Sequence, residues 1–149
     1  MAQNNQSDAT VNVSVKVAAD GGAYTFTYSD PSGLFDSEGN FDFRKPGAKG
    51  KPVTIKFSID NSSVAGIKFQ KQGPNAFWIA LKSEVGDNGC PTGPYVGSQF
   101  HGFRTEPDQR TLTVLDHNND GKPYRYALRF DLNGDLVMHD PDGNNGEGG

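Results

Sequence analysis

Hydrophobic and polar residues alternate along most of this chain, which is the spacing of a β-strand with one buried and one solvent-facing side. The clearest run is 53–59, in which Val53, Ile55, Phe57 and Ile59 are separated by polar residues. We expect eight strands of this kind, at residues 11–17, 24–28, 53–59, 67–70, 77–82, 111–114, 124–132 and 136–138. A ninth is an open alternative around Phe41 and Phe43. No stretch keeps the 3.6-residue apolar period of a helix.

The last two runs are joined by Asn133-Gly134, the strongest short signal for a two-residue hairpin turn. Such a turn fixes the register, and with it the face of each side chain. Val137 is then expected in the core, while Leu136 and Met138 lie on the outer face. Two apolar residues are unusual on a solvated face, so we expect a loop, a partner or a second copy of the chain to cover them. The alternative is a bulge that returns them to the core.

Composition supports an all-β fold. β-Branched and aromatic residues number 38, against 19 for Ala, Leu and Met together, and the 19 glycines and 9 prolines leave little room for long helices. The pattern predicts an immunoglobulin-like antiparallel β-sandwich of about eight strands. A jelly roll or small barrel is the alternative, because strand order cannot be read from one sequence. We expect one domain over residues 1–149, with flexible ends at 1–7 and 143–149.

Charge, hydropathy and cysteine content limit the partners and the cellular location that we expect. The net charge is −4, so the chain lacks the concentrated positive field that nucleic-acid binding needs, and a nucleic-acid partner is not expected. No apolar run approaches the ~20 residues of a membrane-spanning helix, and residues 1–10 show no secretory signal. The single cysteine, Cys90, has no internal disulfide partner. These features predict a soluble, cytoplasmic protein with no membrane partner.

One loop has the residue types of a calcium site. Asp116, Asn118 and Asp120 alternate and are followed by Gly121, as at the start of a Ca²⁺ loop. An EF-hand is excluded, because its twelfth position needs a glutamate and here is an alanine inside a predicted strand. The predicted hairpin register brings Asp142 toward the same end of the sheet, so it is the fourth candidate ligand. The alternative is an ordinary polar turn, which uses the same residue types.

Aromatic residues form the second candidate site. Trp78 lies on the opposite strand face from its apolar neighbours, and Tyr95, Phe100 and Phe103 flank a long Gly- and Pro-rich loop. With Met138, these residues are candidates for contact with a ligand or a protein partner, since aromatic side chains stack on sugars and anchor interfaces. The alternative is that the loop covers them and buries Trp78.

The chain contains no recognisable catalytic set. It has no nucleophile elbow, no phosphate-binding glycine loop and no metal-ligand spacing of His and Cys. We therefore expect a non-enzymatic binding or assembly module without a cofactor, acting on a protein partner or by self-association. The alternative is a carbohydrate- or Ca²⁺-dependent recognition domain.

The acidic dipeptides Glu106-Pro107 and Asp140-Pro141, together with the aromatic pattern of 124–128 and the ending at 139–145, resemble the bacterial DP-EP family of small β-sandwich proteins. The resemblance covers mainly residues 106–145. It implies a sandwich fold and a bacterial intracellular origin, and it carries no known activity. A fainter likeness to bacterial inclusion-body proteins keeps self-assembly among the expectations.

Overall fold

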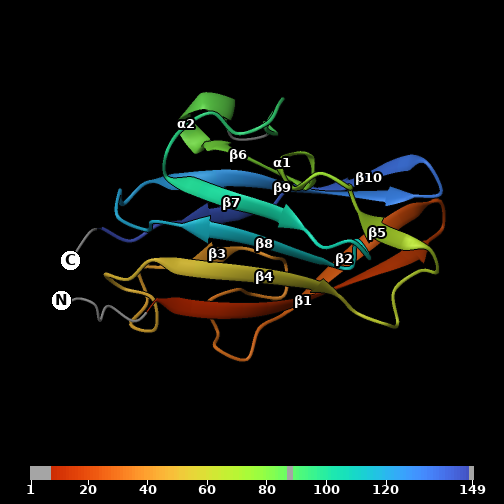
Figure 1. The fold of residues 1–149 in the computed structure, drawn as a ribbon, viewed down its shortest axis with the longest axis horizontal. Helices are drawn as coiled ribbons and strands as arrows, with labels where there is room; N and C mark the ends of the chain where they lie inside the picture. The colour runs from red at the N-terminus through yellow and green to blue at the C-terminus, as the bar shows by residue number, and fades with distance from the viewer. Residues whose placement is uncertain (1–7, 87–88, 148–149) are drawn as a thin grey trace.

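The computed structural model describes residues 8–86 and 89–147, and these form two β-sheets packed face to face (Figure 1). The first sheet has the strand order β2-β1-β4-β8-β7. Its strands are β1 (Ala9–Asp20), β2 (Ala23–Ser29), β4 (Val53–Ile59), β7 (Phe100–Thr105) and β8 (Thr111–Asp116). Strands β1 and β4 run parallel, and the other neighbours run antiparallel.

The second sheet is organised around the long strand β9 (Pro123–Leu132), with the order β10-β9-β11-β3 and two more strands paired to β9. Its other members are β3 (Phe41–Asp42), β5 (Ile67–Phe69), β6 (Phe77–Leu81), β10 (Asp135–His139) and β11 (Asp142–Asn144). Because β10 and β6 both pair with Leu128, they lie on opposite sides of β9. Strand β10 is therefore an edge of this sheet.

Two helical turns, α1 (Gly73–Ala76) and α2 (Lys82–Val85), flank β6. Within the described residues, no helix has the length and apolar character needed to cross a membrane.

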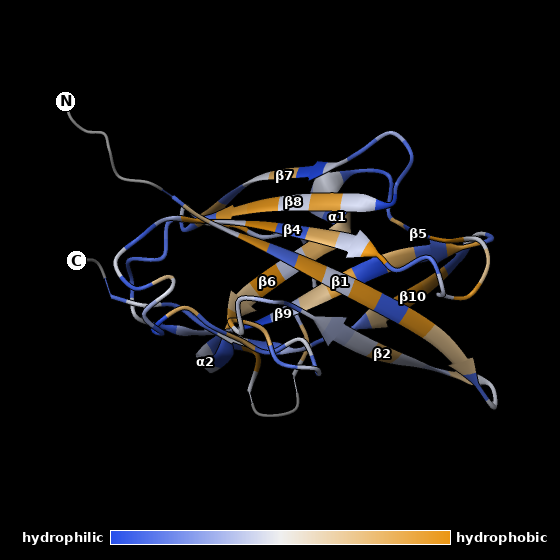
Figure 2. Ribbon diagram, turned by 90° about the horizontal axis from the view of Figure 1, so that it is seen from below, coloured by the Kyte–Doolittle hydropathy of each residue, from blue (hydrophilic) through white to orange (hydrophobic). Residues whose placement is uncertain are grey.

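The core lies between the sheets and follows the period-two pattern of the strands. Figure 2 shows hydrophobic and hydrophilic residues alternating along β1, whose four valines are buried. Aromatic rings fill the centre: the Tyr126 ring lies among Phe41, Phe57 and Phe77, with ring centroids 5.2 to 6.1 Å apart. The buried Tyr126 hydroxyl donates a hydrogen bond to the Gly39 carbonyl, which ties the loop before β3 to the core.

The all-β sandwich is confirmed, and the sheets do not close into the alternative small barrel. The expectation of a purely antiparallel sandwich is wrong. The long connection 30–52 lets the chain return beside β1 in the same direction, and β3 also pairs parallel with β11. Within the end expected to be flexible, β11 pairs with two strands and Glu147 bridges to Asp120, so residues 143–147 lie against the second sheet and the β8–β9 loop. The expected flexible end at 1–7 and residues 148–149 lie outside the described residues.

Candidate functional site

The hairpin of β9 and β10 has the register that the sequence predicts. Leu132 pairs with Asp135 and Phe130 with Val137, and Asn133 at the turn has a φ of 54°. Val137 is buried, whereas 52% of Leu136 and 39% of Met138 is exposed. The register prediction is confirmed, and the alternative of a bulge that buries the two outer residues is wrong.

The backbone of β10 is open on the side away from β9. In a hairpin with a two-residue turn, residues 132 and 135 form a hydrogen-bonded pair. Hydrogen-bonded and non-hydrogen-bonded pairs then alternate along the two strands. Leu136 and Met138 belong to non-hydrogen-bonded pairs, with Asp131 and Arg129 respectively, so their backbone N–H and C=O groups point away from β9. The Arg129 carbonyl confirms this, because it accepts the Gln70 N–H on the opposite side of β9. Among the described residues, no backbone partner meets Leu136 or Met138 on their outward side. We call this row of backbone groups the free edge of β10.

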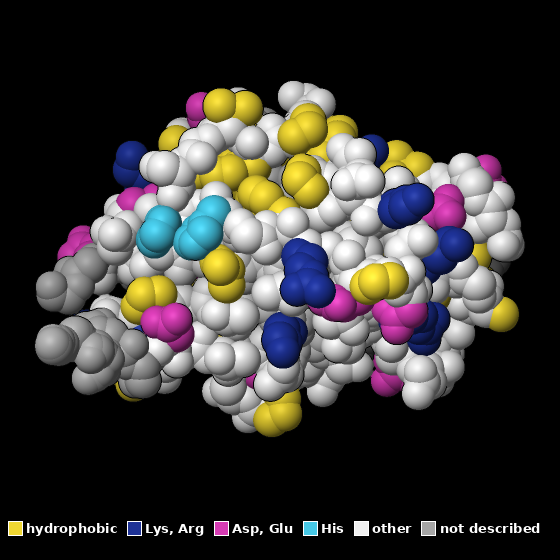
Figure 3. Space-filling model, in the orientation of Figure 1, with side chains coloured by type: hydrophobic (Ala, Val, Ile, Leu, Met, Phe, Trp, Pro, Cys, Tyr) yellow, Lys and Arg dark blue, Asp and Glu magenta, His cyan; other side chains and the backbone are white. Residues whose placement is uncertain are grey.

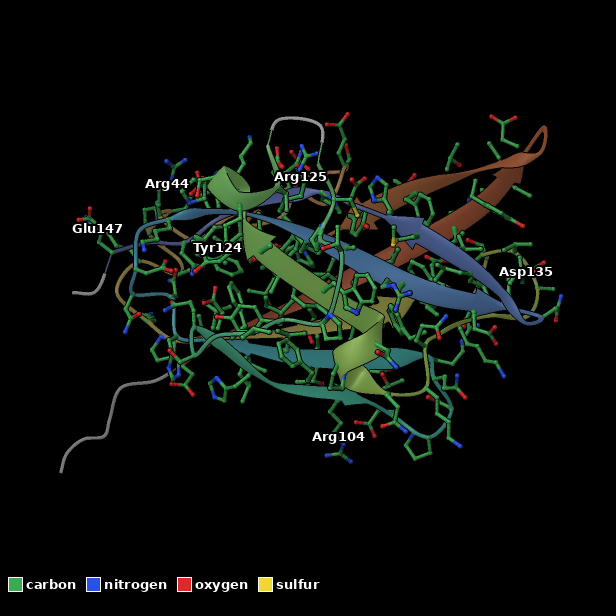
Figure 4. The ribbon with its side chains drawn as sticks, turned by 90° about the horizontal axis from the view of Figure 1, so that it is seen from above. Arg44, Arg104, Tyr124, Arg125, Asp135 and Glu147 are labelled. Carbon is green, nitrogen blue, oxygen red and sulfur yellow. The ribbon has the colours of Figure 1, made fainter. Side chains whose placement is uncertain are left out.

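A groove of about 590 Å³ runs beside this edge, between β10 and strand β2 of the other sheet. The Phe26 ring stacks on the His139 imidazole at 4.5 Å, and the Tyr28 hydroxyl is hydrogen bonded to His139 Nδ1 at 2.8 Å. Burial lowers the pKa of His139, so the ring is neutral at pH 7. Met138 lines the groove, and so does Tyr24, which is also exposed. Figure 4 places Asp135, the first residue of β10, at the end of the molecule opposite Glu147.

The aromatic residues around the Gly- and Pro-rich loop are less accessible than the sequence suggests. Phe100 is only 2% exposed and contacts Tyr124 edge to face at 5.0 Å, so its expected role as a surface contact is wrong. Tyr95 and Phe103 are half-buried and pack against the core, with ring centroids 6.1 Å apart. The Tyr95 hydroxyl accepts the Gln99 N–H and so fixes the loop.

A cavity of about 520 Å³ lies under this loop, bounded by β6, α2 and residues 91–97. Hydrophobic side chains gather near α2 and β6 on the face shown in Figure 3. Tyr95 and Tyr124 form its aromatic walls. Burial, and then the hydrogen bond to Asp120, raises the pKa of Tyr124, which keeps its hydroxyl a neutral donor.

Trp78 is partly covered on the outer face of the second sheet. The Arg129 guanidinium lies over its ring at 3.7 Å, and Arg129 also donates a hydrogen bond to the Asn75 carbonyl at 2.8 Å. The loop after α2 crosses this face, where the Gly89 carbonyl accepts a hydrogen bond from Arg125 at 3.0 Å. One face of the indole is thus taken by an internal cation–π contact, which leaves less ring surface for a sugar to stack on.

The candidate calcium loop is held by internal hydrogen bonds. The buried Asn118 amide donates to three carbonyls, those of Phe43, Ala48 and Lys51, while its oxygen accepts the Gly146 N–H at 2.6 Å. The amide hydrogens and one lone pair of the oxygen thus join three segments of the chain. Asn118 therefore has a structural role in this loop, which also accounts for its burial.

Asp142 does not join the loop residues either. Its carboxylate pairs with Arg125 Nε at 2.9 Å and with Lys82 Nζ at 3.4 Å, on the outer side of the sheet. Among the described residues, no three His, Cys, Asp or Glu side chains form a metal-binding group. The four predicted ligands are thus not brought together as a set.

Two other residues of this region could not be selected from the sequence. Asn145 follows β11 and is fully buried beside Asp116, and Gln99 links Asn119 and Asn145. Asn145 stands in a segment of Gly, Asn and Asp that is typical of a solvated tail, so its composition gives no sign of burial.

No protein-family model matches this chain, and no curated protein matches it either. The resemblance to the DP-EP family therefore stays a prediction.

Proposed function

We propose that this protein is a non-enzymatic assembly module whose copies associate through the free edge of β10. The observation that carries the proposal is the combination of outward backbone groups with two exposed apolar side chains on the same residues, Leu136 and Met138. An open edge of this kind is a template for strand pairing, and proteins that avoid pairing place charged residues or proline there. Neither occurs at positions 136–138.

The strand is complementary to itself. An antiparallel pairing of two β10 strands centred on Val137 brings Leu136 opposite Met138 of the second copy. Both residues direct their backbone groups outward, so the pairing forms about four hydrogen bonds. It also places Asp135 opposite the neutral His139 of the second copy, so that no like charges face each other. The pairing joins the two second sheets into one continuous sheet.

Size-exclusion chromatography with light scattering tests the proposal on the full chain. We expect a dimer whose fraction falls on dilution. Met138→Glu should convert it to a monomer, because two carboxylates would then lie on the joined apolar face. Met138→Pro should do the same, because it removes an N–H that has no partner within the described chain and is tolerated on a free edge.

The control is Val96→Glu, which adds the same charge at an exposed apolar residue far from β10 in the sequence and on a different loop. It should leave the dimer unchanged, and circular dichroism should show the same β-rich spectrum for every variant. A chain that is monomeric at high concentration, or a dimer that survives Met138→Pro, would contradict the proposal. The cytoplasmic location and the carbohydrate alternative stay predictions from the sequence.

A further inference from the structure

Two buried oxygen atoms near the end of the sandwich have no hydrogen-bond partner among the described residues. They are Oδ2 of Asp116, a residue 1% exposed, and Oδ1 of Asn145, a residue 0% exposed. The other oxygen of Asp116 accepts the Asn118 N–H at 2.9 Å, which fixes the orientation of the carboxylate. Leaving such buried acceptors without a hydrogen bond destabilises the fold, and more so where the group is charged.

The charge of this region is also uncompensated. Asp120 is the second carboxylate. Its Oδ1 accepts the Lys122 N–H and the Asn145 amide N–H, each at 3.1 Å, and its Oδ2 accepts the Tyr124 hydroxyl, so its partners are all neutral donors. Within residues 8–86 and 89–147, neither Asp116 nor Asp120 forms an ion pair. Burial raises the pKa of Asp116 to about 7, and the charge of Asp120 adds to the effect. Buried charges in proteins are normally paired or bind a metal ion.

We propose that a hard divalent cation of the Ca²⁺ class binds between Asp116 Oδ2 and Asn145 Oδ1, with Asp120 supplying the second carboxylate. Carboxylate and amide oxygens are the ligands that such cations prefer. A cation satisfies both unpartnered acceptors and also supplies the missing positive charge, whereas a water molecule satisfies only the acceptors. The ligand set differs from the one predicted from the sequence, because Asn145 takes the place of Asn118 and Asp142.

The ligands come from two separated segments. Asp116 ends β8 and Asp120 lies in the following loop, while Asn145 follows β11. Figure 4 shows Glu147, two residues beyond Asn145, at the opposite end of the molecule from Asp135 in β10. A bound cation would therefore fasten the C-terminal segment to the β8–β9 loop, independently of the association proposed at β10.

Isothermal titration calorimetry on protein freed of metal with a chelator tests the proposal, with CaCl₂, MgCl₂ and NaCl as the probes. We expect one Ca²⁺ per chain and a melting temperature that rises with Ca²⁺ concentration. Asp116→Asn should fold, since it removes an unpaired buried charge, and should bind Ca²⁺ at least tenfold more weakly. Asp120→Asn should weaken binding in the same direction.

Asp142→Asn is the matched control, because it removes one carboxylate of the same kind from the outer side of the sheet. It should bind Ca²⁺ as the parent does. The proposal is overturned if calorimetry shows no binding of Ca²⁺ or Mg²⁺, in which case a water or a proton satisfies the two oxygens. It is equally overturned if Asp116→Asn keeps the parent affinity, if Asp142→Asn loses it, or if NaCl at equal ionic strength raises the melting temperature as much as CaCl₂.

Discussion

Replacing Asn118 with aspartate should destabilise the fold severely, although the two side chains have nearly the same shape. The Asn118 amide nitrogen lies 3.0 Å from the Ala48 carbonyl, 3.1 Å from that of Lys51 and 3.4 Å from that of Phe43. In Asn118→Asp an oxygen takes the place of this nitrogen. Three hydrogen bonds are lost, and a negative charge faces three carbonyl oxygens in a buried site.

The magnitude follows from these contacts. Each lost hydrogen bond removes about 0.5–1.5 kcal/mol of net stability, and each buried group left unsatisfied costs about 1–3 kcal/mol. The three carbonyl oxygens can accept hydrogen bonds from other donors, whereas a buried negative charge is harder to compensate. We therefore expect Asn118→Asp to lower the free energy of unfolding by about 3–5 kcal/mol. Asn118→Ala loses the same donors without adding charge, so we expect about 2–3 kcal/mol. The free energy of unfolding of a typical domain is only about 5–15 kcal/mol in total.

Urea unfolding followed by Trp78 fluorescence and by circular dichroism measures both variants. The deficit of Asn118→Asp should shrink between pH 7 and pH 5, because burial raises the pKa of the new carboxyl and protonation removes its charge while restoring one donor. The deficit of Asn118→Ala should stay constant over the same range. The role assigned to this amide would be refuted if Asn118→Asp lost less than about 1 kcal/mol of unfolding free energy at pH 7. It would also be refuted if Asn118→Asp were as stable as Asn118→Ala.

Three further predictions concern the packing of the sandwich. Tyr126→Phe removes the buried donor to the Gly39 carbonyl and should cost about 1–2 kcal/mol in urea unfolding. Gly143→Ala should cost at least about 2 kcal/mol, because a Cβ at this position would lie 2.1 Å from the Phe41 ring; near-parent stability would contradict the close packing. Burial lowers the pKa of His139 below its usual 6.5, so the stability gained from the neutral ring is present above pH 6.5 and is lost as the pH falls through the folded-state pKa. The fall in melting temperature between pH 7 and pH 5 should therefore be smaller in His139→Gln than in the parent protein.

The parts of the fold that the sequence predicts correctly are those in which local rules decide the outcome. The Asn133-Gly134 turn sets the pairing of β9 with β10, and the same register continues to Asp142, which pairs with Arg125 as expected. The eight predicted strands each overlap an observed strand. Burial alternates most clearly in β1, β4 and β8, where every second residue lies in the core.

The strands that the sequence does not reveal lack this alternation for identifiable reasons. In β7 the register shifts between His101 and Arg104, and Gly102 has a φ of 65°, so the buried positions no longer recur every second residue. In β11 the central residue is a glycine, because the Phe41 ring occupies the space of a side chain. A strand of Asp, Gly and Asn is indistinguishable from a turn until its neighbours are known.

The loop from Asp116 to Asp120 shows why residue type alone did not define a site. Asp and Asn oxygens serve equally well to bind a cation and to satisfy backbone groups, and the choice depends on which long-range partners reach them. The carbonyl groups of Phe43 and Ala48 reach Asn118 across at least 70 positions in the sequence and accept its amide N–H groups, whereas no donor reaches Oδ2 of Asp116 among the described residues. The same loop therefore contains one side chain that is structural and one that still lacks a partner. The unpartnered oxygens belong to Asp116 and Asn145, and this is why the proposed ligand set differs from the one that the spacing suggests.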